Sequence, residues 1–161
     1  MSEPERTYWS GGCQCGAVRF RADCLGRASH CHCRMCQKAF GSIGGSLVVA
    51  IDLVWTRSAP KYFQSSNKVR RGFCGTCGTP LTFEFAQTVD VAIATFDKSE
   101  LIAPDMQLVR AARLPWADGL ATLPERSGEN QAMAASFSAS IISYQHPDHD
   151  TAEWPSPGLK T

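Results

Sequence analysis

The sequence predicts a mainly β fold of short antiparallel strands, followed by a possible C-terminal helix. Three observations support this prediction. Segments in which apolar and polar side chains alternate recur from residue 17 to residue 95, with the two-residue period of a half-buried strand. Glycine and proline separate these segments at short intervals, as they do at turns. Clustered cysteines lie at several of these turns, where a bound metal would hold the strand ends together.

The first predicted elements surround the first two groups of cysteines. Residues 17–21 alternate apolar and charged side chains and are expected to form a half-buried strand, and residues 26–29 a turn. Residues 34–40 favour a helix, which Gly41 is placed to end. Residues 44–51 are rich in β-forming side chains and predict a buried strand.

The following segment repeats the strand pattern. Strands are expected over residues 61–63, 69–73, 80–85, 89–95 and 106–113. Two of these strands are expected to present an apolar face, formed by Leu81, Phe83 and Phe85 in one and by Val89, Val91 and Ile93 in the other. The strand over residues 69–73 runs directly into a cysteine pair, which predicts a hairpin-like bend there.

The character of the chain changes after about residue 125. Met133, Phe137, Ile141 and Tyr144 follow at intervals of four, four and three, which is one face of a helix that must end before Pro147. The two histidines of residues 146–150 are interpreted as part of a solvated tail rather than a metal site, and the remainder is expected to be loose. We therefore divide the chain into a domain of residues 1–125 and a C-terminal extension of residues 126–161.

Charge and composition exclude several classes of function. The formal net charge of +1 and the absence of long basic runs argue against a nucleic-acid partner. No segment approaches the about 20 apolar residues of a membrane span, and the polar residues 1–8, expected to be a frayed end, do not resemble a signal peptide. These features predict a cytoplasmic protein without a membrane partner, and they leave the oligomeric state open.

The cysteines carry the strongest chemical signal. Seven of the eight fall into three tight groups, formed by Cys13 and Cys15, by Cys31, Cys33 and Cys36, and by Cys74 and Cys77. Thiolates two or three residues apart can bind one tetrahedral ion, and these spacings are typical of zinc. Seven ligands suggest two zinc sites, one closed by four thiolates and structural, the other holding three and leaving a position for water or substrate.

Alternatives to this division remain at the sequence level. Disulfides are the first, although paired neighbours in a C-x-C motif rarely bridge each other. The second is a further structural zinc site, in which Cys24, a histidine or a fixed water completes the shell of the three central thiolates. The third is a central site that loses or exchanges its zinc easily.

Three motifs together identify a family. The segments GGCQCGAVRF (residues 11–20), CHCRMCQK (residues 31–38) and GFCGTCGTPL (residues 72–81) closely resemble the glutathione-dependent formaldehyde-activating enzyme family, which shares its domain with centromere protein V. The later Leu114-Pro115-Trp116 resembles the closing proline–tryptophan element of that family. The resemblance covers roughly residues 9–124. It departs at Met106-Gln107-Leu108, where members of the family often carry a histidine, and this departure bears on the identity of the substrate.

The resemblance implies a β-tent fold and a partition of the ligands. Cys13, Cys15, Cys74 and Cys77 would share the structural zinc, and Cys31, Cys33 and Cys36 would hold a second zinc, the one for which the number of ligands leaves a catalytic role and easy loss of the ion open. It also implies a carbon–sulfur lyase, S-(hydroxymethyl)glutathione synthase-like, acting on the adduct of a small glutathione-like thiol with an aldehyde such as formaldehyde. The zinc would lower the pKa of the thiol and present it as a thiolate. The alternatives are a zinc-stabilised protein-binding module without catalysis, and a redox role for the central cysteines.

Residues around the clusters are open to more than one interpretation. Cys24 is expected to be a small buried hydrophobe, Trp116 a core residue, and the ring of His32 to point away from the metal. The basic residues that flank the clusters either bind the carboxylates of a glutathione-like substrate or form a solvated rim; they are Arg34, Lys38, Arg70 and Arg71.

Overall fold

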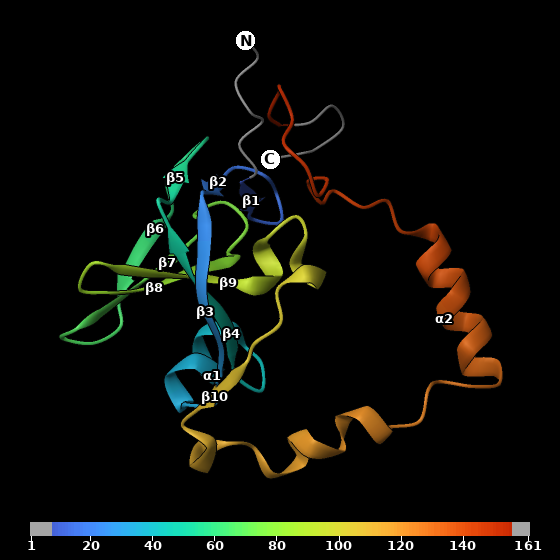
Figure 1. The fold of residues 1–161 in the computed structure, drawn as a ribbon. Helices are drawn as coiled ribbons and strands as arrows, with labels where there is room; N and C mark the ends of the chain where they lie inside the picture. The colour runs from blue at the N-terminus through green and yellow to red at the C-terminus, as the bar shows by residue number, and fades with distance from the viewer. Residues whose placement is uncertain (1–7, 156–161) are drawn as a thin grey trace.

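The computed structural model describes residues 8–155 (Figure 1) and confirms a mainly β fold built from two sheets. The expectation for residues 1–7 lies outside the described residues. The smaller sheet is antiparallel and has the order β1-β2-β5. Its strands are β1 (Trp9–Gly12), β2 (Arg19–Ala22) and β5 (Val54–Trp55).

The larger sheet has the order β10-β3-β4-β9-β8-β7-β6. Its strands are β3 (Cys24–Cys31), β4 (Gly45–Ile51), β6 (Lys61–Gln64), β7 (Val69–Phe73), β8 (Pro80–Phe85), β9 (Thr88–Ala92) and β10 (Met106–Leu108). The strands pair antiparallel, except that β10 runs parallel to β3. Strands β6 to β9 form a continuous meander, whose β7–β8 bend carries the last cysteine pair.

The predicted helix over residues 34–40 is confirmed as α1 (Arg34–Phe40). The Cys33 side chain caps its first turn by accepting a hydrogen bond from the backbone N–H of Cys36, and Gly41 ends it in the left-handed region at φ 58°. Four 3₁₀ turns follow between α1 and the end of the described residues: η1 (Ile93–Thr95), η2 (Ser99–Leu101), η3 (Arg110–Ala112) and η4 (Pro115–Thr122).

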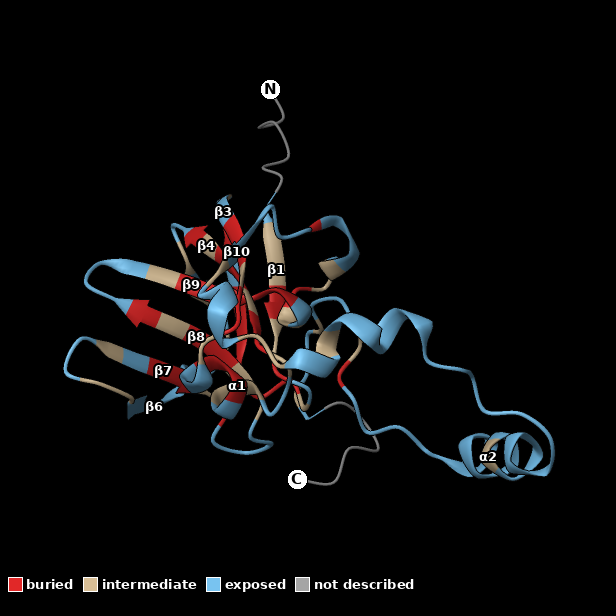
Figure 2. Ribbon diagram, turned by 90° about the horizontal axis from the view of Figure 1, so that it is seen from below, coloured by how far each residue is buried: buried red, intermediate tan, exposed pale blue. Residues whose placement is uncertain are grey.

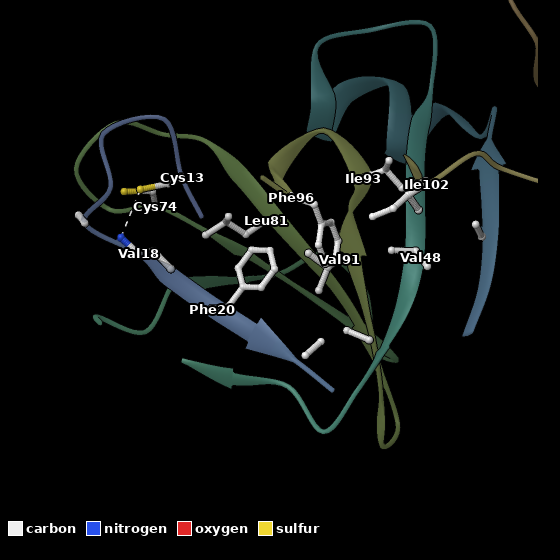
Figure 3. Close-up of a cluster of buried hydrophobic side chains, with 14 residues drawn as sticks. Cys13, Val18, Phe20, Val48, Cys74, Leu81, Val91, Ile93, Phe96 and Ile102 are labelled. Atoms are coloured by element: carbon white, nitrogen blue, oxygen red, sulfur yellow. Dashed lines mark hydrogen bonds between the residues drawn. The ribbon is translucent and has the colours of Figure 1, made fainter. Parts of the chain in front are cut away.

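The hydrophobic core lies between the two sheets (Figure 3). Phe20 of β2 is fully buried and meets Phe96 edge to face, with ring centroids 5.0 Å apart. Leu81 and Val91 of the larger sheet close around it, and the chain segments with Cys13 and Cys74 lie at the edge of the same cluster. The core therefore reaches directly to the predicted metal ligands.

One turn prediction and the bounds of two predicted strands were wrong. Residues 26–29 are not a turn but part of β3, which absorbs them through an irregularity between Leu25 and Ala28. The strand at residues 106–113 ends at Leu108, because Val109 adopts the left-handed region at φ 53° and η3 follows. Ile93 is buried but lies in η1 rather than in a strand.

The predicted apolar face of β8 was also wrong. Thr82 and Glu84 are buried alongside Leu81, whereas Phe85 is exposed. Glu84 is accommodated because its carboxylate accepts hydrogen bonds from Thr82 Oγ1 at 2.9 Å and from Arg70 Nε at 2.7 Å. The alternation of apolar and polar residues cannot predict that a polar side chain is buried in a sheet by such hydrogen bonds.

The C-terminal helix is confirmed as α2 (Glu129–Ser140), although it ends before Ile141 and Tyr144. It stands apart from the sheets, and Figure 2 shows it exposed along most of its surface. Its Met133 and Phe137 are exposed rather than packed on the domain. No helix among the described residues combines the length and apolar character needed to cross a bilayer.

Candidate metal centres and active site

Cys13, Cys15, Cys74 and Cys77 form a four-cysteine cluster. The β1–β2 loop provides the first two sulfurs and the β7–β8 bend the others, and all four lie within 4.8 Å of one another. The Sγ atoms of Cys13 and Cys15 are 3.6 Å apart, and those of Cys15 and Cys74 are 3.8 Å apart. A tetrahedral ion with metal–sulfur bonds of about 2.3 Å separates its sulfurs by about 3.8 Å, so the cluster has the dimensions of a four-thiolate site.

The same distances contradict the disulfide alternative. A disulfide requires a sulfur–sulfur distance of about 2.05 Å, and all eight cysteines are free. Cys24, which was expected to be buried, is exposed at the start of β3 and joins neither cluster.

Backbone donors surround the four-cysteine cluster. The N–H of Val18 donates to Cys13 Sγ at 3.2 Å, and the N–H groups of Thr76 and Cys77 donate to Cys74 Sγ at 3.4 and 3.5 Å. Burial raises the pKa of the Cys13 thiol well above its ordinary value. Burial acts in the same direction on Cys77, but hydrogen bonds from the Thr79 hydroxyl and backbone outweigh it and lower the pKa of that thiol to about 6. The N–H donors favour thiolates at these positions, whereas burial opposes them, so four thiolates in this cluster would need a cation to compensate their charge.

Cys31, Cys33 and Cys36 form a three-cysteine cluster within one short segment. Cys31 ends β3, Cys33 caps α1, and Cys36 lies in the first turn of that helix, so the chain brings the sulfurs within 4.8 Å locally. Among residues 8–155, no fourth cysteine, histidine or carboxylate donor joins them within that distance. The cluster therefore offers three protein ligands, which is the number a substrate-accepting zinc site provides.

His32 lies between two of these cysteines but is not directed at the cluster. Its Nε2 pairs with Gln107 Oε1 of β10 at 3.0 Å, and the residue is buried. Gln107 occupies the segment in which the sequence departs from its family resemblance. The residue at which this chain differs from the family pattern therefore contacts His32, the neighbour of two cysteines of the cluster.

Arg71 lies in a different environment from the solvated rim that the sequence favours. It is 7% exposed rather than part of a solvated rim, and its Nη2 lies 3.5 Å from Cys36 Sγ. Its Nε and Nη1 have no hydrogen-bond partner among the described residues. Burial raises the pKa of the Cys36 thiol to about 12, and the Arg71 guanidinium opposes this by favouring the thiolate. Its neighbour Arg70 differs, because it pairs with Glu84 at 2.7 Å.

Two cavities are lined by residues next to the three-cysteine cluster in the chain, although none of its cysteines lines them. The first, here called the basic cavity, has a volume of about 310 Å³ and is lined by Arg34, Met35, Lys38, Ala39, Phe63, Ser65 and Arg71. The second, here called the histidine cavity, has a volume of about 610 Å³ and is lined mainly by His30, His32, Asp105, Met106, Gln107, Arg113 and Asp118. Trp116, expected in the core, is 58% exposed on η4 and lines neither cavity.

Comparison with protein families settles the relationship that these clusters suggest. A family model described as "Glutathione-dependent formaldehyde-activating enzyme" matches residues 8–111. The chain belongs to this family. A solved structure of a Rhodobacter sphaeroides protein from a structural genomics programme is similar at a TM-score of 0.50 and 22% identity, covering 61% of this chain and 98% of that one. That similarity shows a shared fold, whereas no curated protein matches the chain.

Both cysteine clusters lie inside the region matched by the glutathione-dependent formaldehyde-activating family, but residues 144–155 lie beyond it. This segment, here called the C-terminal strap, returns from α2 to the β1–β2 loop (Figure 1). The backbone N–H of His146 donates to Gln14 O at 2.7 Å, and Trp154 Nε1 donates to Cys15 O at 2.7 Å. The predicted solvated tail was therefore wrong for His146, which is 4% exposed, whereas His149 is exposed as expected.

Charged side chains fasten the strap further. Arg57 donates to Gly16 O at 2.7 Å and to Thr151 O at 2.8 Å, bridging the loop and the strap. Arg19 is buried between Asp97 and Asp150, with a closest distance of 2.6 Å to each carboxylate. The strap partners lie up to 139 positions apart in the chain, so local patterns carry no signal for them.

Proposed function

We propose that this protein is a zinc-dependent carbon–sulfur lyase-type enzyme that handles the adduct of a small, glutathione-like thiol with a small aldehyde such as formaldehyde. Membership of the glutathione-dependent formaldehyde-activating family supports the enzyme class. The observation that carries the proposal is the three-cysteine cluster, which offers three ligands without a fourth among the described residues. We assign catalysis to the domain of residues 1–125 and regard residues 126–161 as an extension of it.

The residues of each cluster have distinct proposed roles. Cys13, Cys15, Cys74 and Cys77 hold a structural zinc, and Cys31, Cys33 and Cys36 hold a second zinc with an open position. A zinc ion bound there supplies positive charge that lowers the pKa of an incoming thiol, so that a thiolate is present near neutral pH. The family resemblance and the dimensions of the clusters support this assignment.

The chain's own residues prepare the site for such a thiol. Arg71 sets a buried positive charge against Cys36 and so offsets the negative charge that three thiolates concentrate there. Gln107 holds His32 away from the sulfurs and leaves the approach to the cluster free of that ring. The reaction needs no redox partner, because a carbon–sulfur bond forms as the thiol proton is transferred overall to the carbonyl oxygen. Reversal of this addition cleaves the same bond.

We further propose that the enzyme acts in the cytoplasm, where thiols remain reduced and can bind metal. The eight free cysteines are consistent with such a compartment. Its small-molecule partners would then be reduced thiols and their aldehyde adducts.

Calorimetric titration of the zinc-loaded protein with glutathione tests the proposal. We expect binding to the wild-type protein and a loss of at least about tenfold in affinity for Cys31→Ser, which removes one ligand of the proposed catalytic zinc. Cys24→Ser is the matched control, because Cys24 is exposed and outside both clusters. Absence of binding by any small thiol, or unchanged binding by Cys31→Ser, would contradict the proposal and favour the protein-binding module.

A further inference from the structure

We propose that the basic cavity binds a carboxylate of the thiol substrate, so that the enzyme selects small thiols that carry a negative charge. This inference rests on the proposed function, and it names the substrate class of the same site. It assigns to Arg34, Lys38 and Arg71 the recognition of a charged group rather than a part in the chemistry of the sulfur.

The cavity has a one-sided charge. Arg34 and Lys38 are separated by one turn of α1 and lie on the same side of that helix, and Arg71 reaches the cavity from β7. The described residues that line it include three cations and no carboxylate. Such a concave surface with charges of one sign raises the local concentration of an oppositely charged ligand.

Arg71 connects this cavity to the three-cysteine cluster. The same guanidinium that lines the cavity has its Nη2 3.5 Å from Cys36 Sγ, while Nε and Nη1 are buried and without a hydrogen-bond partner among the described residues. Leaving buried N–H groups without an acceptor is unfavourable, and a carboxylate at the end of the guanidinium can accept from Nη1, or from Nη1 and Nη2 together in a planar, bidentate geometry. A ligand whose sulfur reaches the cluster can therefore place its carboxylate at the same arginine.

Arg70 shows by contrast why this role falls to Arg71. The Arg70 guanidinium is 4.1 Å from the centre of the Tyr62 ring and hydrogen-bonds Glu84, so its charge is already compensated. Arg71 also meets a ring, that of Phe83 at 5.0 Å, but no carboxylate is paired with it in the described part of the chain.

The remaining walls suit the carbon skeleton of a small ligand. Met35 of α1 and Phe63 of β6 are 52% and 63% exposed and provide an apolar lining next to the cations. A volume of about 310 Å³ is at the lower end of the range of small-molecule sites. The larger histidine cavity is a poorer site for an anion, because Asp105 and Asp118 line it and Arg113 is paired with Asp118 at 2.9 Å.

The first test compares two thiols of the same carbon chain length, 3-mercaptopropionate, which ends in a carboxylate, and 3-mercapto-1-propanol, which ends in a neutral hydroxyl. In calorimetry with the zinc-loaded wild-type protein, we expect the acid to bind about tenfold more tightly than the alcohol. In Arg34→Gln/Lys38→Gln, which changes two exposed positions of α1, this preference should fall to about twofold or less. Lys98→Gln/Arg126→Gln removes the same charge elsewhere and should keep the wild-type preference. Equal binding of the two thiols, or a preference that survives in the α1 variant, overturns the inference.

A second measurement separates failure of this inference from failure of the proposed function. S-methylglutathione keeps both carboxylates of glutathione but has no thiol to offer the cluster. With methionine methyl groups labelled for NMR, its addition should shift the Met35 signal and leave those of Met106, in the histidine cavity, and Met133, on α2, unchanged. Such a shift supports the carboxylate site even if no thiol binds the cluster. No shift at Met35, or a shift at Met106 instead, contradicts it, whatever the outcome with thiols.

Discussion

The two cysteine clusters are built from the chain in opposite ways. The four-cysteine cluster joins loops about 60 residues apart and lies at the edge of the core, with the C-terminal strap fastened to its first loop. The three-cysteine cluster comes from six consecutive residues at the end of β3 and the start of α1. The first cluster thus joins two segments that are distant in the sequence, whereas the second is formed within one segment and has only three ligands. We therefore expect that a metal ion can be gained or lost at the second cluster with little effect on the rest of the fold.

The largest effect is expected at the four-cysteine cluster. Cys74→Ser removes a buried ligand that joins the β7–β8 bend to the β1–β2 loop. Structural zinc contributes on the order of 10 kcal/mol or more in isolated peptides, which is comparable with the whole stability of a domain. We therefore expect the variant to be largely unfolded at 25 °C, as measured by circular dichroism and zinc content. A folded variant with normal metal content would show that this cluster is not structural.

A smaller effect on the fold is expected at the three-cysteine cluster. Cys36→Ser removes one of three local ligands and the partner of Arg71, so we expect loss of one zinc per chain with the thermal unfolding midpoint lowered by only a few degrees. Glutathione affinity should fall by at least about tenfold. Atomic absorption and calorimetry measure both quantities. Unfolding as complete as that of Cys74→Ser would remove the distinction between the clusters.

The strap bonds to the loop that carries Cys13 and Cys15, and Trp154→Ala tests how much this contact contributes to stability. This change removes a half-buried ring that packs against the core and the hydrogen bond to Cys15 O, and we expect it to cost about 2 kcal/mol of unfolding free energy. Trp116→Ala is the matched control, because that ring is exposed and a surface change costs about 0.5 kcal/mol or less. Denaturant-induced unfolding measures the free energy of unfolding of both variants. Equal effects of the two changes would mean that the strap adds nothing.

The smallest effect is the pH dependence of the buried Arg19–Asp97 ion pair, in which Arg19 also meets Asp150 of the strap. Burial disfavours the Asp97 carboxylate, but hydrogen bonds from Arg19 and Ser10 outweigh burial and hold the pKa of Asp97 below its ordinary value. Because the pKa is lower in the folded state, this stabilisation is complete above the unfolded value of about 4 and is lost as the pH falls further. The difference in stability between the wild type and Asp97→Asn should therefore be constant from pH 5 to 7 and narrow towards pH 3. A difference that does not change over this range would contradict the assignment.

The sequence predicted the local features of both clusters well. Cysteine spacing, the Gly41 helix end and strand alternation all depend on neighbouring residues, and the structure confirms α1 and the mainly β fold. The grouping of the two outer cysteine pairs came only from the family resemblance, because spacing alone cannot bring residues 60 positions apart together. The structure places all four sulfurs within 4.8 Å.

The features that the sequence could not predict are side-chain environments that depend on polar contacts between residues distant in the chain. Arg71 looked like a solvated cation, because nothing in its neighbourhood along the chain shows that β7 turns it towards Cys36. His146 and Trp154 looked like parts of a loose tail, because their acceptors, Gln14 O and Cys15 O, are backbone atoms with no side-chain signature. Cys24 and Trp116 were placed inside from residue type alone, and both are exposed.

The most direct measurement is a chelator titration of the zinc-loaded protein, in which zinc release, circular dichroism and cysteine alkylation are followed together. We expect one zinc to leave first while the protein stays folded, and Cys31, Cys33 and Cys36 to become alkylated at this stage. The second zinc should leave only as the protein unfolds and the other four ligands become reactive. Simultaneous release of both ions, or alkylation of Cys13, Cys15, Cys74 and Cys77 before the others, would contradict the account.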